Sequence, residues 1–302
     1  MDTTAGLIII FTIICIGIGM IAALSGVCGG VLFIPFLTLV FGFPMREAIF
    51  LSLIGMMGLT ISAALSYMRE RYVNYHLTAI YSVLDYPGII LGGILTTFLF
   101  ENLLAGLCGL VMIVIGIKIF LTRKSHRKRG IGVDKFDMDS RDESKTPKTL
   151  SGEESKEISE KDHESIEKNL RYEKYGVDDF RIVAISSFSG GFLSAMLGFG
   201  GGTIKTSSMF LAGVEPKTAA ASSELSMTFS ATFAAVTHFF LGSFNGVIIW
   251  PILIVFGTII GAQLGVKVCK RVKAHSVQTV FSFIVFYVGI LMILSFFNKG
   301  IM

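Results

Sequence analysis

The chain has 302 residues, of which 52% are hydrophobic and 16% charged, and its mean hydropathy is +0.70. Soluble globular domains carry about 25% charged residues, so this composition excludes an ordinary soluble domain. The charges are also unevenly placed, since 30 of the 48 charged residues lie between Arg123 and Arg181. Elsewhere, apolar stretches of about 20 residues match the ~30 Å hydrocarbon core of a bilayer. The sequence therefore predicts an all-α polytopic membrane protein.

Eight apolar segments have the length of transmembrane helices, four on each side of the charged region. They are residues 5–24, 46–68, 76–99, 102–122, 181–197, 216–241, 245–269 and 276–297. Two shorter apolar pieces, 30–43 and 203–213, follow glycine clusters, so we expect broken or re-entrant helices there. The chain starts with an acidic Asp2 and has no basic n-region, which favours a retained first span over a cleaved signal peptide.

The two apolar halves are interpreted as internal repeats. The motif GVCGG at 26–30 matches GFGGG at 198–202 with an offset of 172 residues, and the same offset pairs Pro44 with Pro216. Duplicated membrane units are common in secondary transporters, where the binding site lies between the repeats. Four spans in each half predict parallel repeats, whereas an odd number would invert the second half.

Three regions follow from this reading. Residues 1–122 form the first membrane repeat, 123–180 a charged, mostly disordered cytoplasmic linker, and 181–302 the second repeat. The linker has too few large apolar residues to offset chain entropy by burial. We expect both the N-terminus and the C-terminus to be cytoplasmic, because the basic residues at 69–71 and 123–129 then lie on the cytoplasmic side. The basic residues at 267–273 would lie outside, which conflicts with the positive-inside rule.

The glycine clusters predict an anion site. Successive glycines break a helix, and the next half-helix then begins with unpaired N–H groups and a partial positive charge. Tight helix packing through small residues is the alternative. The predicted substrate-binding residues are Ser25, Gly26, Gly29, Gly30, Ser52, Gly198, Gly200, Gly201, Gly202, Lys205, Ser222 and Ser223.

Ionisable side chains within the spans are candidates for coupling, because burying a charge in lipid costs several kcal/mol. Desolvation favours the neutral acid, so Asp85 or Glu224 could take up and release a proton. His238 near the end of its span is a third candidate. The alternative is purely structural: a Lys205–Glu224 pair, a hydrogen-bonded Asp85 and an interfacial His238.

The repeated glycine motif resembles the sulfite exporter TauE/SafE family of membrane transporters. The matching stretches are LSGVCGGVLFIPFLTLVFGFPMREAIFLS, from Leu24 to Ser52, and AMLGFGGGTIKTSSMFLAGVEPKTAAASSE, from Ala195 to Glu224. The resemblance covers both membrane halves and excludes the linker. It implies a secondary transporter that exports or takes up sulfur-containing anions such as sulfite and organosulfonates.

The expected function is therefore movement of a small anion, a sulfur oxyanion or organosulfonate, across the cell membrane, with the lipid bilayer as the surrounding partner. Uptake of another small anion, such as a carboxylate, and a scaffold that uses the charged linker remain alternatives. No P-loop, metal-ligand spacing or basic nucleic-acid face is visible, so we expect no cofactor, no metal and no nucleic-acid partner. We also expect that the protein is not an enzyme.

Overall fold

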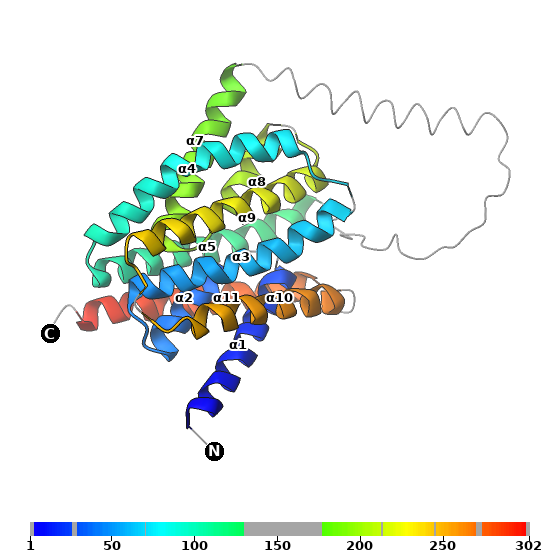
Figure 1. The fold of residues 1–302 in the computed structure, drawn as a ribbon. Helices are drawn as coiled ribbons and strands as arrows, with labels where there is room; N and C mark the ends of the chain where they lie inside the picture. The colour runs from blue at the N-terminus through cyan, green and yellow to red at the C-terminus, as the bar shows by residue number, and fades with distance from the viewer. Residues whose placement is uncertain are drawn as a thin grey trace, which may run out of the picture.

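The computed structural model describes residues 3–25, 29–69, 71–129, 177–212, 214–244, 246–269 and 274–299. These residues form ten α-helices and one π-helical turn, and no strand (Figure 1). In the first half they are α1 Thr3–Ser25, α2 Gly30–Pro35, the π-helical turn η1 Phe36–Val40, α3 Met45–Arg69, α4 Tyr75–Phe98 and α5 Glu101–Arg129. In the second half they are α7 Val177–Leu197, α8 Gly202–Leu211, α9 Pro216–Phe240, α10 Ile249–Cys269 and α11 Ala274–Lys299.

Each of the eight predicted spans coincides with a long helix, and the two shorter apolar pieces form short helices. The helices extend into both ends of the predicted linker, to Arg129 and from Val177. Residues 130–176, where most of the predicted disorder falls, lie outside the described residues.

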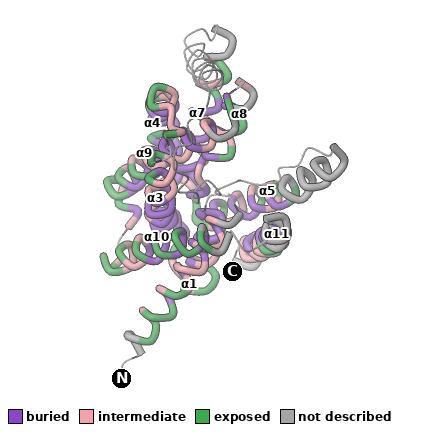
Figure 2. The backbone as a smooth tube through the Cα atoms, turned by 90° about the vertical axis from the view of Figure 1, so that its right-hand side faces the viewer, coloured by how far each residue is buried: buried purple, intermediate pink, exposed green. Residues whose placement is uncertain are grey.

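Helix length and outer surface both fit a membrane environment. Three described helical segments are long and apolar enough by themselves to cross a bilayer, namely Gly6–Ala23, Met45–Arg69 and Tyr75–Phe98. Shorter apolar stretches occur in α5, α7, α10 and α11. Buried residues line the interior of the bundle, as along α3 in Figure 2, while large apolar side chains such as Ile13, Phe98 and Phe256 are exposed on its surface. Such an apolar exterior is typical of lipid contact.

The helices of the two halves pack against each other rather than within each half. Helix α1 packs along α10, α4 along α7, and α5 along α11, while α3 packs between α9 and α10. Glycines allow these close approaches: a Cβ on Gly109 would lie 2.9 Å from the carbonyl oxygen of Gly289, across the α5–α11 contact.

Contacts along neighbouring helices give their directions. Helices α5 and α11 are antiparallel, because Gly106 lies beside Phe296 and Gly116 beside Phe286. Figure 1 shows α3, α5 and α10 running one way through the bundle and α4, α9 and α11 running the other way. The last helices of the two halves thus have opposite directions, so the expectation of parallel halves is wrong for this pair.

Helix directions also define two ends of the bundle. At the linker end, α3 ends at Arg69, α5 ends at Arg129 and α10 ends at Cys269. At the opposite end, α9 ends at Phe240 and α11 ends at Lys299. The expectation that the linker and the C-terminus share one face is therefore not compatible with the helix directions.

Candidate functional site

The two glycine clusters meet inside the bundle. A Cβ on Gly30 would clash with the carbonyl oxygen of Gly198 and lie 3.1 Å from Cα of Phe199. Ser52 of α3 joins the two clusters, since its hydroxyl donates to the Gly198 carbonyl at 2.8 Å and lies 3.5 Å from that of Gly30. Gly26 lies outside the described residues, as does the side chain of Ser25.

Backbone geometry explains why glycine occupies the second cluster. Gly198 and Gly200 have φ angles of 64° and 77°, in the left-handed region that side chains disfavour. Gly201 packs against Gly190 of α7, where a Cβ would lie 2.5 Å from a carbonyl oxygen. The chain therefore turns back against α7 at this point, and α8 begins at Gly202.

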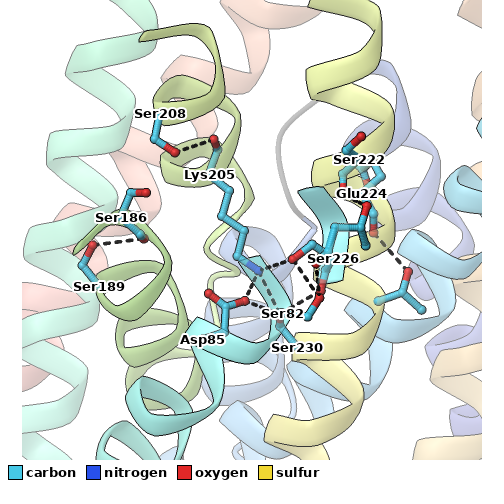
Figure 3. A network of polar contacts seen from close by, with 12 residues as sticks. Ser82, Asp85, Ser186, Ser189, Lys205, Ser208, Ser222, Glu224, Ser226 and Ser230 are labelled. Atoms are coloured by element: carbon cyan, nitrogen blue, oxygen red, sulfur yellow. Dashed lines mark hydrogen bonds and ion pairs between the residues drawn. The ribbon is translucent and has the colours of Figure 1, made fainter. Parts of the chain in front are cut away.

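A buried ion pair lies beyond this turn. Lys205 in the first turns of α8 pairs with Asp85 of α4, and their side chains are 1% and 0% exposed (Figure 3). The lysine also donates to Ser230 at 2.8 Å and to Ser226 at 3.1 Å, both on α9. The site thus joins one helix of the first half to two helices of the second half.

Hydroxyl groups continue from the ion pair along the α4–α9 contact. The Ser230 hydroxyl hydrogen-bonds the Asp85 carboxylate, and Ser82 donates to Ser226 at 3.2 Å. On the α8 side, the Tyr81 hydroxyl lies 2.8 Å from that of Ser208. Asp85 was a predicted coupling candidate, but the sequence did not single out the hydroxyl residues near it, Tyr81, Ser82, Ser208, Ser226 and Ser230. A serine at every fourth position of α9 nevertheless indicates one polar helix face.

Ser222 and Ser223 hold helices together at some distance from the glycine contact. The Ser222 hydroxyl accepts from the backbone N–H of Asn74 at 3.0 Å, just before α4. Ser223 accepts from the hydroxyl of Thr206 on α8 at 2.7 Å. Both serines are buried, so the structure gives them interhelical contacts toward the linker end.

The other two coupling candidates lie apart from the ion pair. Glu224 is two residues from Ser226, so it points about 200° away from Ser226 around α9. Lys205 forms its ion pair with Asp85, so the alternative of a Lys205–Glu224 pair is wrong. His238 is fully buried, and both ring nitrogens have partners. Nε2 donates to the Ala195 carbonyl at 2.8 Å, and Nδ1 lies 3.0 Å from the Ser243 hydroxyl. The bond to Ala195 connects α9 to α7, and the contact with Ser243 is with the segment that follows α9.

The site offers one cation, one carboxylate and several hydroxyl groups, all buried in the bundle. Such a set can hold an anion and balance its charge, because a buried charge needs a partner of opposite sign. Within the described ranges, no group of three His, Cys, Asp or Glu residues has metal-binding geometry.

Helices interrupted by glycine around a buried charged centre, within an apolar bundle, are the architecture of a membrane transporter. The family model for the sulfite exporter TauE/SafE matches residues 11–292. The chain therefore belongs to this family, which is a transporter family and not an enzyme family, and the protein is a multi-pass membrane protein. The resemblance seen in the glycine motifs is confirmed.

Two relatives give the range of similarity. The chain is 22% identical over 281 residues to "Probable membrane transporter protein YunE" of Bacillus subtilis (strain 168), covering 90% of this chain and 92% of the relative. It is 30% identical over 113 residues to "Sulfite exporter TauE/SafE family protein 6" of Arabidopsis thaliana, covering 37% of this chain and 25% of the relative. No solved structure matches the chain.

Proposed function

We propose that the protein is a secondary transporter that moves a small anion, a sulfur-containing oxyanion or organosulfonate, across the cell membrane. The observation that carries the proposal is the contact of Gly30 with Gly198 inside the bundle, with buried Lys205 one turn into the next helix. In this proposal Lys205 supplies the positive charge. Backbone N–H groups of the two clusters and the Ser52 hydroxyl bind the anion's oxygens.

The two membrane halves, 1–122 and 181–302, are proposed to be inverted repeats joined by the 123–180 linker. In each half, the first helix and the short helix after it then form a hairpin that enters and leaves on the same side of the membrane. The other three helices cross the membrane, and this odd number of crossings inverts the second half. Equivalent contacts support this relation: Gly191 of α7 abuts Asp85 of α4, as Gly19 of α1 abuts Thr258 of α10. Antiparallel α5 and α11 fit it as well.

Inversion removes the conflict in the distribution of basic residues. Arg69, Arg129 and Lys267 all lie in the last turns of helices that finish at the linker end. Because basic residues mark the cytoplasmic side, we propose that the linker is cytoplasmic and that both termini are external. The linker stays on the side expected from the sequence, whereas both termini move to the other side of the membrane.

Cysteine labelling tests the proposed orientation. In a variant without the four native cysteines, Asn298→Cys near the end of α11 is expected to react with a membrane-impermeant maleimide in intact cells. Ser155→Cys in the linker is expected to react only after permeabilisation, because the bilayer blocks the reagent. The reverse pattern would contradict the proposed orientation, and anion flux measured in the same variants shows whether they are folded.

Flux measurement tests the proposed function. The purified full chain, reconstituted into liposomes, is expected to give saturable uptake of labelled sulfite or methanesulfonate, above that of protein-free liposomes. Unlabelled sulfite should compete with either probe. Faster flux of acetate would identify a carboxylate permease instead, and absence of flux for all three anions would overturn the transport proposal.

A further inference from the structure

We propose that Asp85 is the proton-binding group of this transporter and that Lys205 pairs alternately with Asp85 and with the transported anion. Without anion, the carboxylate neutralises the lysine; with anion bound to Lys205, Asp85 carries a proton. One proton then moves with each anion in the same direction. This inference rests on the proposed function and adds the coupling ion and its binding group.

The contacts of Asp85 leave it dependent on Lys205. Its side chain is fully buried, and one carboxylate oxygen, Oδ2, carries both the ion pair and the bond from Ser230. The other oxygen, Oδ1, is buried without a hydrogen-bond partner among the described residues. Lys205 is thus the group that neutralises Asp85 within this part of the chain, and an anion at Lys205 competes for the same charge.

Few other titratable groups surround this carboxylate. From α4 itself, Tyr81 lies one turn away, and its phenol hydroxyl is 2.8 Å from that of Ser208 on α8. Helix α7 packs Gly191 against the backbone of Asp85. Helix α9 contributes the Ser230 hydroxyl, which bonds the carboxylate, and the Ser226 hydroxyl, which bonds Lys205. His238 of α9 bonds Ala195 and Ser243, and the ion pair of Lys205 is with Asp85 and not with Glu224, so the exchange involves Lys205, Asp85 and the anion.

Burial provides the coupling. When an anion binds the Lys205 ammonium group, the Asp85 carboxylate loses its counter-charge while it remains out of water. A buried carboxylate without a counter-charge is strongly disfavoured, so it takes a proton from hydronium, which leaves water. When the anion departs, Asp85 returns its proton to water and re-forms the ion pair with the ammonium group.

A row of hydroxyl groups leads from Asp85 toward the linker end. Ser230 and Ser226 follow the carboxylate, Ser82 bonds Ser226, and Thr78 donates to the Ser222 carbonyl at 3.2 Å, close to the start of α4. These groups extend polar contacts from the ion pair to the linker end of the bundle, and several of the bonds go to backbone carbonyls, those of Thr78, Ser222 and Ser226.

The equivalent positions of the other half carry no charge. The offset of 172 places Phe33 opposite Lys205 and Gly58 opposite Ser230, and the matching glycine contacts place Thr258 opposite Asp85. A Cβ on Gly58 would meet the Thr258 hydroxyl, so the α3–α10 contact repeats the α9–α4 contact with neutral groups. One coupled charge pair per chain is therefore expected, giving one proton per anion.

A pH gradient tests the coupling. Liposomes containing the full chain are held at zero membrane potential with potassium and valinomycin and are made one pH unit more acidic outside. The probe is methanesulfonate, which stays ionised, or sulfite if methanesulfonate is not carried, with uptake by protein-free liposomes subtracted. One proton per anion gives about tenfold accumulation per pH unit in the wild type. Asp85→Asn is expected to retain downhill flux and lose this accumulation.

Matched variants separate coupling from folding. Asp85→Glu is expected to restore accumulation, and Glu101→Gln, an exposed carboxyl in the first turn of α5, to leave it unchanged. Asp85→Asn/Lys205→Gln removes both charges and shows by thermal stability whether the bundle tolerates their loss. The inference would be overturned if Asp85→Asn still accumulates the anion, or if Glu224→Gln loses accumulation while Asp85→Asn keeps it. Downhill flux without accumulation in the wild type would refute the coupling and leave the transport function standing; no flux would refute both.

Discussion

Lys205→Met is expected to abolish saturable anion flux. The methionine keeps most of the side-chain length but removes the ammonium group that holds Asp85 and, in our proposal, the anion. Loss of one partner of a buried charge pair costs about 2–5 kcal/mol in binding, which corresponds to roughly 30-fold or more in affinity. Uptake of labelled sulfite and methanesulfonate into liposomes measures this loss.

Stability must be separated from flux in this variant, because Asp85 is left buried without its counter-charge. Breaking a buried pair destabilises a protein by about 3–5 kcal/mol, whereas neutralising both partners costs much less. The Asp85→Asn/Lys205→Met variant should therefore regain thermal stability but not flux. Lys267→Met, in the exposed last turn of α10, is the matched control and should transport normally. Normal flux in Lys205→Met would exclude the lysine as the anion's ligand.

Gly30→Ala is expected to lower both thermal stability and flux. A Cβ at this position would overlap the Gly198 carbonyl oxygen and lie 2.7 Å from Sδ of Met56, so the two glycine clusters must separate. Overpacking of this kind costs about 1–3 kcal/mol, which corresponds to a fall of the order of 5 °C in melting temperature. If the anion binds between the clusters, flux should fall by about tenfold or more.

Another glycine provides the control for this prediction. Gly17 in α1 has open space around it, with no atom within 4 Å of the point that a Cβ would occupy, so Gly17→Ala should leave packing intact and slightly favour the helix. Thermal melts of detergent-purified protein and flux in liposomes compare the two variants. Equal stability and flux in Gly30→Ala and Gly17→Ala would show that the contact between the clusters is not needed.

Much of the local structure could be predicted from the sequence, because hydrophobic length and glycine act over short distances. The spans coincide with helices, and the second glycine cluster marks the point where the chain turns back against α7. Asp85 and Lys205 were recognised individually, since ionisable residues are rare in apolar segments. The sequence did not single out Ser230, although it lies one helical turn beyond Ser226. It suggested Glu224 as the partner of Lys205, because Glu224 is nearer in the sequence than Asp85.

The composition and the two glycine motifs by themselves determined that this is a helical membrane protein of the TauE/SafE family. Only the tertiary structure decided that Lys205 pairs with Asp85, 120 residues earlier in the chain, because that contact requires α4 of the first half to pack against α7 and α9, the two helices on which α8 lies. It also decided the opposite directions of α5 and α11. Hydropathy reports how apolar each segment is, but the direction and neighbours of a helix depend on long-range packing.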